Sequence, residues 1–349
     1  MKTLSNSPLA AYTSLHAGGK AEHLIEIEGG DDLGKVIELA TKPLWVLGYG
    51  TNVLVSDQGL PGTVILNRSG QIEYLGNGKI RADSGANWDD LVKLAISKNL
   101  WGLEFTSQIP GGVGAAIAGN IAAYGHKIED SFVEAQILDT KTNKIQTWPK
   151  DKFEFGYRTS SLQKPANAHF VVLDATFSLS PTSRDELEYD SALKVAAELG
   201  LKPDSLANRR KIIIETRRRA GSLLQDTKAG PWTAGSFFKN PSVSKDQMHS
   251  LLEHEENNLT REMLLKQNKI HTGTKTKVPA AHVLLAAGFH RGQTWGQVRL
   301  HPQHILKVEN IGNASASDIY QVVQEIIKTV KEKLDIELEP EVRFLGEFK

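Results

Sequence analysis

The chain has 349 residues, more than a single hydrophobic core usually serves, so two or three domains are expected. Its 41 basic residues balance 41 acidic ones, which excludes the long-range positive field of a general nucleic-acid or anionic-membrane binder. It has no cysteine, which excludes disulfides, iron–sulfur ligation, thiolate zinc sites and cysteine nucleophiles.

The N-terminal stretch lacks the apolar core of a signal peptide. No later run reaches the roughly 18 apolar residues that a membrane span needs. We therefore expect a cytoplasmic globular protein without membrane insertion.

The first elements along the chain are predicted to be a strand, a helix and a second strand. Residues Glu22–Glu28 alternate polar and apolar side chains, as a half-buried strand does. A helical pattern covers Asp31–Lys42, and the apolar run Leu44–Leu47 predicts a short strand that enters a glycine turn. Further on, Asn87 is a good N-cap for a helix. The apolar stripe of that helix comprises Trp88, Leu91, Val92, Ala95 and Ile96.

The middle of the chain predicts a second unit of strands and helices. Apolar runs rich in β-formers indicate strands at Phe132–Asp139 and Phe170–Ser178. A helix from near Leu206 is expected to end in a basic cluster, with a domain junction just after it. The cluster consists of Arg217, Arg218 and Arg219.

The last part of the chain predicts one long helix and a final strand, after a polar run at Glu253–Lys277 that looks the least compact. Ser315 should begin the helix, whose apolar side chains recur at helical spacing and are expected to be core. In the final strand, Glu339–Phe344, Glu341 would face a cleft from a rigid strand. The apolar face of the helix comprises Ile319, Val322, Val323, Ile326, Ile327, Val330 and Leu334.

A glycine-rich turn follows the strand at Leu44–Leu47. Glycines allow backbone N–H groups to approach an anion closely, so a phosphate site is reasonable here, as is a purely structural turn. A dinucleotide fingerprint would need a third glycine opening a helix, whereas Val53 stands in a strand-like context. The cofactor-binding candidates are Gly48, Tyr49, Gly50, Thr51 and Asn52.

A second glycine-rich segment begins at Gln108 and continues to Gly125. A proline, clustered glycines and an alanine-rich helix would place bare backbone amides at a helix N-terminus, where a pyrophosphate is stabilised. Close packing of small residues is the structural alternative. The cofactor-binding candidates are Ile109, Pro110, Gly111, Gly112, Val113, Gly114, Ala115, Asn120, Tyr124 and Gly125.

With these segments in place, the sequence resembles the UDP-N-acetylenolpyruvoylglucosamine reductase family over nearly its whole length. Both glycine segments take part in the resemblance, as do Tyr12–Ser14 and Gly18–Gly19 near the N-terminus. The most specific motifs are Gly156–Ser160, Ala234–Pro241 and Glu339–Arg343, in that order.

The resemblance implies an α+β fold. Two subdomains, residues 1–70 and 71–220, would bind FAD as the vanillyl-alcohol-oxidase/PCMH flavoproteins do, and a C-terminal α+β domain, residues 221–349, would bind the UDP-sugar. It also implies non-covalent FAD, NADPH as the hydride source, and reduction of UDP-N-acetylenolpyruvoylglucosamine to UDP-N-acetylmuramate in peptidoglycan synthesis. The partners would be small molecules, with no nucleic acid, and we expect a monomer.

Three residues of these motifs suit the chemistry. Reducing an enol ether that carries a carboxylate delivers a hydride to one alkene carbon and a proton to the other. The fork of Arg158, also counted among the cofactor-binding candidates, would hold the carboxylate. By resemblance, Ser236 would donate the proton. Glu341 would stand as a protonated or shared-proton carboxyl beside the developing enol.

Each of these residues also has a structural explanation: an exposed arginine, a turn serine, an ordinary ion pair. Two departures from the family pattern matter. Tyr49 puts bulk beside the phosphates, and Ala220 stands where the family often has a lysine, so phosphate contact would come from the arginines. No His, Asp or Glu spacing compels a metal, and none is predicted. The substrate-binding candidates are Tyr189, Arg219, Lys239 and Asn240.

Two other functions stay open at this point. A related FAD-dependent oxidase or dehydrogenase of a hydroxy acid or alcohol would need the cofactor loops without Ser236 and Glu341. A non-catalytic flavin-binding module would show no substrate-dependent oxidation of NADPH.

Overall fold

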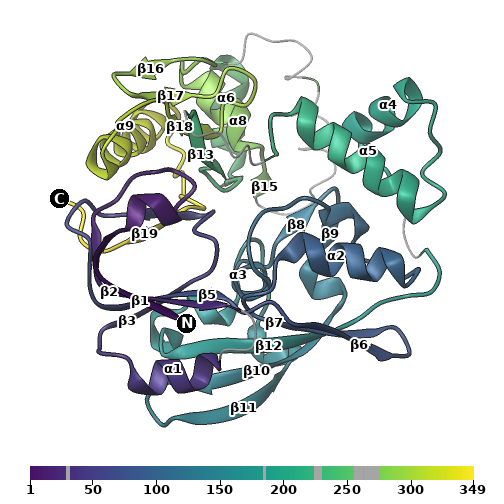
Figure 1. Ribbon diagram of the computed structural model, residues 1–349. Coiled ribbons are helices and arrows are strands. Elements are labelled where there is room, and N and C mark those ends of the chain that lie inside the picture. The colour runs from purple at the N-terminus through teal and green to yellow at the C-terminus, as the bar shows by residue number, and fades with distance from the viewer. Residues whose placement is uncertain (29–31, 184–185, 224–229, 255–261, 263–274) are drawn as a thin grey trace. The chain divides into compact units, whose positions relative to one another are not determined.

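The computed structural model describes residues 1–28, 32–183, 186–223, 230–254, 262 and 275–349 (Figure 1). The chain forms two units, each assembled from separate stretches of sequence. The first comprises Met1–Ser7, Ala21–Gly50 and Pro61–Gln225, and the second comprises Pro8–Lys20, Thr51–Leu60 and Asp226–Lys349. The three-part division of the chain into consecutive domains stays a prediction. Most of the polar run Glu253–Lys277 lies outside the described residues.

The first sheet of the first unit has the strand order β1-β2-β5-β3. Helix α1, Leu33–Leu39, is shorter than predicted: Asp32 caps it by accepting from the Lys35 N–H at 3.2 Å, and the backbone is extended again at Ala40 before Pro43. The strands are β1 (Lys2–Pro8), β2 (Lys20–Glu28), β3 (Leu44–Leu47) and β5 (Leu60–Arg68).

The second sheet of this unit is antiparallel, with the order β11-β10-β12-β7-β6. Its strands β10 and β12 have the bounds predicted from sequence. Asn87 caps α2, Trp88–Ser97, by accepting from the N–H groups of Asp89 and Asp90. The apolar stripe of α2 packs against this sheet together with α3, Val113–Ala118, and of the stripe only Ile96 is partly buried. The strands are β6 (Ile72–Gly76), β7 (Lys79–Asp83), β10 (Phe132–Asp139), β11 (Lys144–Pro149) and β12 (Phe170–Ser178).

A short hairpin and a helix pair complete the first unit. The hairpin joins β8, Ala122–Ala123, to β9, His126–Lys127. Helices α4, Asp190–Glu198, and α5, Leu206–Arg219, share a small core with Phe105. The predicted end of α5 in the arginine cluster is confirmed. Short 3-10 turns lie at Glu104–Thr106, Ile128–Asp130, Lys150–Phe153, Ser161–Gln163 and Pro165–Asn167.

The second unit is built on an antiparallel sheet with the order β13-β18-β17-β16. Its apolar face packs with α6, α8 and α9, and Ser315 begins α9 through a capping box with Asp318, as expected. Of the predicted apolar face of α9, Ile327 alone is only partly buried. The elements are β13 (Trp232–Ser236), β14 (Ser242–Val243), α6 (Lys245–His254), β15 (Thr276–Lys277), α8 (Ala280–Ala286), β16 (Thr294–Trp295), β17 (Val298–Leu300), β18 (Lys307–Asn310) and α9 (Ala316–Leu334).

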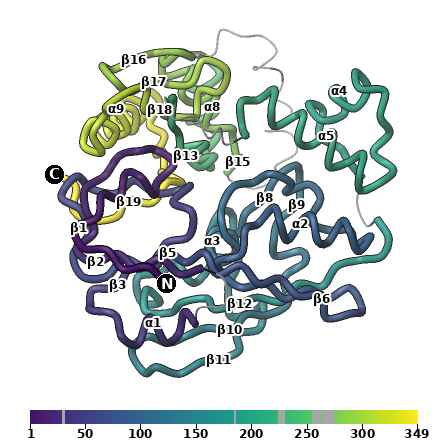
Figure 2. The backbone as a smooth tube through the Cα atoms, in the orientation of Figure 1, coloured from purple at the N-terminus to yellow at the C-terminus, as the bar shows by residue number. Residues whose placement is uncertain are grey.

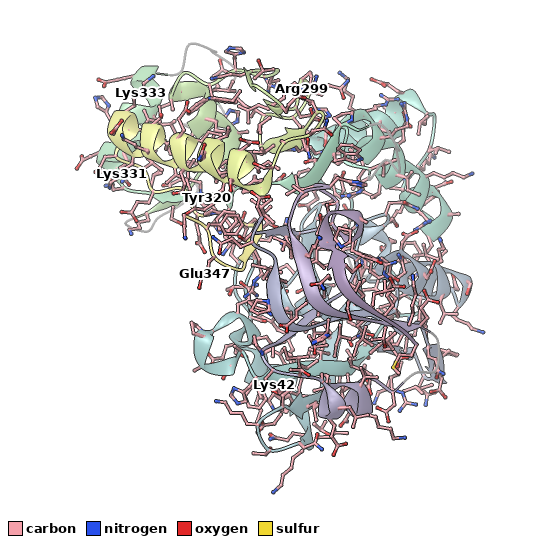
Figure 3. All side chains as sticks on the ribbon, turned by 60° about the vertical axis from the view of Figure 1, so that its left-hand side comes forward. Lys42, Arg299, Tyr320, Lys331, Lys333 and Glu347 are labelled. Atoms are coloured by element: carbon pink, nitrogen blue, oxygen red, sulfur yellow. The ribbon has the colours of Figure 1, made fainter. Side chains whose placement is uncertain are left out.

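The C-terminal segment pairs with an N-terminal one inside the second unit. Strand β19, Arg343–Leu345, lies parallel to β4, Val53–Val55, so the yellow end of the chain runs beside a dark N-terminal segment in Figure 2. The ring of Tyr320 on α9, labelled in Figure 3, packs on Phe344 at 5.2 Å between centroids. The predicted strand Glu339–Phe344 is therefore wrong in its first half, because regular pairing begins only at Arg343 and Glu341 lies in a bend before it.

Strand β4 also confirms the strand-like context predicted for Val53. In the described part of the chain, no helix combines the length and apolar character needed to cross a bilayer.

Candidate functional site

The first glycine turn follows β3 and brings the ring of Tyr49 to the second glycine segment. The Tyr49 hydroxyl donates to the carbonyl oxygen of Gly85 at 3.3 Å, and the guanidinium of Arg68 lies 5.5 Å from the ring centre. A Cβ atom added at Gly112 would lie 3.5 Å from a carbon of this ring. Burial raises the pKa of the Tyr49 hydroxyl, which therefore stays protonated at neutral pH. The Tyr49 ring therefore packs between the two glycine segments.

The last two residues of this turn, Thr51 and Asn52, belong to the second unit. The Asn52 amide donates to the carbonyl oxygen of Glu341 at 3.1 Å, and the Asn52 carbonyl accepts from the N–H of Arg343 at 3.1 Å. Asn52, predicted from sequence as a cofactor contact, thus holds the bend that carries Glu341.

The second glycine segment differs from its prediction in one respect. The N–H groups of Val113 and Gly114 at the start of α3 are not bare, because they donate to Ala86 O at 3.0 Å and Ser84 O at 2.8 Å. Helix α3 has six residues and ends at Ala118, and Gly119 and Asn120 lie beyond it. An anion at this segment would therefore depend on loop amides and side chains more than on the helix terminus.

The loop before α3 keeps the features that a phosphate-bearing cofactor such as FAD requires. Within the described residues, the N–H groups of Gly111 and Gly112 donate to no acceptor. Gly111 has φ +125°, a conformation open mainly to glycine. A Cβ atom added at Gly48 would meet only the Gly112 nitrogen, at 4.0 Å. The two glycine segments thus meet at open space lined by backbone donors, which fits a diphosphate.

The Tyr124–Gly125 pair is the tip of the β8–β9 hairpin. Both residues have positive φ, 51° and 87°, as a two-residue type I′ turn demands. The Tyr124 ring stands edge-on to the ring of Tyr189, with 5.5 Å between centroids. Burial raises the pKa of Tyr124, while the charge of Arg217 lowers it in part. Tyr189, just before α4, is 53% exposed, so it is placed beside Tyr124 and still open to a ligand.

Arg158 occupies a strained turn. Gly156 and Thr159 exchange two backbone hydrogen bonds, at 3.0 and 3.3 Å, around Tyr157 and Arg158. The φ of Arg158 is +54°, unfavourable for a branched or long side chain. Asn120, also a predicted cofactor contact, has its amide on the Gly156 carbonyl at 2.9 Å and so anchors this turn to the end of α3. Such strain at a predicted catalytic arginine is typical of functional sites.

The arginine cluster at the end of α5 divides between two faces of the helix. Arg219 is on the outer face, where it pairs with Glu198 and Glu215. Arg217 is turned inward, and its Nη2 donates to Gln108 O at 3.3 Å and to Ser222 O at 2.9 Å. Burial lowers the pKa of Arg217, and none of the described carboxylates forms an ion pair with it.

Arg217 was not among the sequence candidates, although a signal for it existed. It follows Arg210 by seven residues and Ile213 by four, the spacing of the inward face of a helix. Arg210 and Ile213 both pack inward, the former on Asp89. Helical spacing would therefore have favoured Arg217 over Arg219.

Ser236 and Glu341 come together inside the second unit. Ser236 ends β13 after Gly235, whose φ is +81°. The next residue, Phe237, accepts at its carbonyl from the Glu341 N–H at 2.8 Å, and Phe238 bridges to Pro340. The proposed proton donor and carboxyl therefore sit on adjacent, hydrogen-bonded segments that are 105 residues apart in sequence.

The two predicted substrate contacts beside Ser236 have protein partners. The Lys239 ammonium lies 2.6 Å from a carboxylate oxygen of Glu339. The side-chain amide oxygen of Asn240 (Oδ1) accepts from the Ala280 N–H at 2.9 Å and so holds the start of α8. Both residues belong to the same unit as Ser236, and a role in binding would be added to these structural ones.

Two family models match the chain. The FAD binding domain matches residues 21–147, and the model described as UDP-N-acetylenolpyruvoylglucosamine reductase, C-terminal domain, matches residues 225–345. Two similar curated proteins are both named UDP-N-acetylenolpyruvoylglucosamine reductase. The one from Saccharopolyspora erythraea is 31% identical over 96% of this chain and 93% of its own length. The one from Thermobifida fusca is 30% identical over 98% and 97%.

A solved structure shares the fold. The UDP-N-acetylenolpyruvylglucosamine reductase of Thermus caldophilus has a TM-score of 0.61 and 23% identity, covering 99% of this chain and 98% of that one. Together with the FAD-domain match, it confirms the predicted α+β flavoprotein fold.

Proposed function

The chain belongs to the family of UDP-N-acetylenolpyruvoylglucosamine reductases, and from that premise we propose that Arg158, Ser236 and Glu341 carry its chemistry. It is an FAD-dependent oxidoreductase that reduces UDP-N-acetylenolpyruvoylglucosamine with NADPH in peptidoglycan precursor synthesis. A related oxidase, or a non-catalytic flavin-binding module, is not favoured, because the C-terminal reductase domain is present alongside the FAD domain.

One observation carries the assignment of the catalytic groups. Ser236 and Glu341 belong to motifs far apart in sequence, yet the hydrogen bond from Glu341 N to Phe237 O at 2.8 Å makes them neighbours. Such placement is expected of a hydroxyl and a carboxyl that act on one substrate group. Asn52 adds to it by holding the Glu341 carbonyl.

The residues that would hold FAD are those at which the two glycine segments meet. The N–H groups of Gly111 and Gly112 would donate to the diphosphate, and the Tyr49 ring keeps the segments apart. When bound, FAD supplies hydride transfer from NADPH to the alkene, in two half-reactions. We propose that NADP+ leaves before the enolpyruvyl sugar enters.

The roles of the catalytic groups follow from the charge that develops during the reaction. Hydride arriving at one alkene carbon sends negative charge toward the other carbon and the carboxylate. The Arg158 guanidinium would bind that carboxylate through its fork of donors. Ser236 would then give its proton to the carbon, since a carbon-centred anion is basic enough to take it from a hydroxyl. Glu341, in protonated form, would donate a hydrogen bond to the enol oxygen.

Substrate binding is proposed to use Tyr189, Lys239 and Asn240, as expected from sequence. For the phosphate charge we now favour Arg217 over Arg219. Arg217 is partly buried and has no carboxylate partner in the described chain, whereas Arg219 is already paired on the outer face. A partly desolvated cation of this kind gains most from a bound anion.

The visible spectrum of the purified protein tests the proposed activity. The yellow flavin band should bleach on anaerobic addition of NADPH and return on addition of the enolpyruvyl sugar. Failure of the sugar to restore the colour without oxygen would reject the activity.

Ser236→Ala tests the assigned acid. Flavin reduction by NADPH should proceed as in the wild type, whereas reoxidation by the sugar should slow by about 100-fold or more, the usual contribution of a general acid. A Ser250→Ala variant, on α6 of the same unit, serves as the control. Equal sugar-dependent reoxidation in Ser236→Ala and wild type would refute the role.

We also propose that the protein is a cytoplasmic monomer. The absence of cysteine and the UDP-sugar and NADPH substrates are consistent with a reducing cytoplasm. Light scattering after size exclusion should give a mass near 38.3 kDa, and a value near twice that would contradict the monomer.

A further inference from the structure

We propose that Lys307 is a positioning residue for proton transfer, stabilising the negative charge that Ser236 acquires when it protonates the substrate carbon. The inference rests on the acid role proposed for Ser236 and adds a partner to it. No motif in the sequence pointed to Lys307.

The register of the second unit's sheet places Lys307 directly opposite Ser236. Strands β13 and β18 are antiparallel and pair Ser236 with Lys307. The flanking bond from Phe237 N to Leu306 O, at 2.7 Å, identifies Ser236 and Lys307 as a non-hydrogen-bonded pair. In such pairs the two side chains leave the same face of the sheet, with Cβ atoms about 4.5–5.5 Å apart. An ammonium on Lys307 is thus within reach of the serine oxygen.

A bulge in β13 creates this pairing. Trp232 pairs with Asn310 and Thr233 with Glu309, so unbroken register would set Gly235 opposite Lys307. The register shifts between Thr233 and Ser236, and Gly235 takes φ +81° there. Between these two pairs, β13 advances by three residues and β18 by two, so Ser236 instead of Gly235 lies opposite Lys307. Bulges commonly re-aim a functional side chain in this way.

Lys307 is a buried charge on a polar sheet face. Only 3% of Lys307 is exposed, and Glu309, two residues along on the same face, is 2% exposed. Glu309 is engaged by Arg299, labelled in Figure 3, which donates to one carboxylate oxygen through Nε at 2.8 Å and Nη2 at 2.7 Å. The pair of Ser236 and Lys307 therefore lies on a buried, polar face of the sheet, where a charge acts more strongly than it does in water.

Two histidines complete the ionisable surroundings of Lys307. His301 lies 3.7 Å from Glu309. Burial lowers the pKa of His301; the charge of Glu309 partly offsets this shift, and the charge of Lys307 adds to it. Burial, followed by the charges of Lys307, His301 and Arg291, lowers the pKa of His304 to about 4. Both histidines are therefore neutral near pH 7, and the charged side chains that act on them are those of Lys307, Arg299, Arg291 and Glu309.

The chemistry requires what Lys307 can supply. As the O–H bond of Ser236 breaks and the new C–H bond forms, negative charge develops on the serine oxygen. The hydride for the other alkene carbon comes from NADPH by way of the flavin, and water later returns the proton to Ser236. An ammonium brought within about 5 Å of that oxygen, at an effective dielectric near 20, would stabilise an alkoxide by roughly 100-fold or more.

Lys307→Met, which removes the charge at similar volume, tests the proposal on the full-length holoenzyme. Flavin reduction by NADPH should match the wild type. Anaerobic reoxidation by the enolpyruvyl sugar should slow by about 10- to 100-fold, with a larger solvent deuterium isotope effect because proton transfer becomes more rate-limiting. Lys307→Arg, which restores the charge, should keep the reoxidation rate within about threefold. Lys328→Met, on the exposed side of α9, is the matched control.

The outcomes separate this inference from the function on which it depends. If the wild type is not reoxidised by the sugar, the proposed activity itself fails. If the wild type is reoxidised and Lys307→Met reoxidises equally fast, or Lys307→Arg is as slow as Lys307→Met, the role of Lys307 is overturned. Should Lys307→Met fail to bind FAD, Lys307→Gln replaces it, with the same decision between slowed and unchanged reoxidation.

Discussion

Asp89 ties three elements of the first unit together, and removing its charge should destabilise that unit strongly. Its carboxylate accepts from Nη1 and Nη2 of Arg210 on α5 at 2.8 and 2.7 Å. It also accepts from the backbone and side-chain amides of Gln108, at 2.7 and 2.9 Å. Gln108, with φ +60°, opens the second glycine segment. Asp89→Asn keeps the shape of the side chain and loses its charge.

The expected cost follows from these four bonds. Hydrogen bonds to a charged group contribute about 1.5–3 kcal/mol each, and an asparagine amide would turn an NH2 group toward one pair of donors. The Arg210 side chain is only 16% exposed, so it would be left as a largely buried cation without its partner. Breaking a buried pair from one side costs about 3–5 kcal/mol, and we expect a loss of at least about 3 kcal/mol for Asp89→Asn.

Urea unfolding followed by tryptophan fluorescence would measure this loss, since Trp88 and Trp101 lie close in sequence to Asp89. Asp90→Asn is the matched control, because Asp90 is the next residue of α2, with a side chain that is 58% exposed and forms a surface ion pair with Lys93. The control should change the free energy of unfolding by less than about 1 kcal/mol. Equal midpoints for the two variants would refute the reasoning, as would additive losses in Asp89→Asn combined with Arg210→Met.

Three further predictions concern other parts of the site. Arg217→Met should weaken binding of the phosphate-bearing ligand by about 10-fold or more, because the inward-facing cation is lost. Titration calorimetry would compare the affinities of Arg217→Met and Arg219→Met for that ligand, and equal affinities would contradict the choice of Arg217. Asn52→Ala should lower the rate of flavin reoxidation by the sugar about 10-fold, because Glu341 loses the hydrogen bond that holds it, while flavin reduction by NADPH is unchanged. Stopped-flow absorbance measures both half-reactions, and equal slowing of the two would contradict this role of Asn52. Burial lowers the pKa of His304 in the folded protein from 6.5 to about 4, so its contribution to stability is complete above pH 6.5 and is lost as the pH falls toward 4. Between pH 7.5 and pH 4.5, the free energy of unfolding of the wild type in urea should fall by up to about 3 kcal/mol more than that of His304→Gln. Equal losses in the two proteins would refute this prediction.

Much of the local structure followed from the sequence because its signals act over a few residues. Asn87 and Ser315 cap their helices through side chains that reach backbone amides three residues on or nearer. The apolar, β-rich runs at Phe132–Asp139 and Phe170–Ser178 are strands with the predicted bounds. The family motifs likewise supplied the candidate residues of the site, whose roles stay proposals, and did not predict what those residues contact.

The contacts of the site depend on segments that lie far apart in sequence. Asn52 holds Glu341 across 289 residues, and no local pattern specifies that bond. The prediction of bare amides at the start of α3 failed because Ser84 and Ala86 supply carbonyl partners from another loop.

Sequence alone determined which residue types are present and where helices and strands form, since propensity, capping and periodicity operate within one or two turns. Tertiary structure decided which of those residues face each other. The bulge at Gly235 set Ser236 opposite Lys307, and the packing of α5 turned Arg217 inward and left Arg219 outside. The physical reason is that register and helix rotation are fixed by burial against distant partners, whose free energy no local stretch of sequence contains.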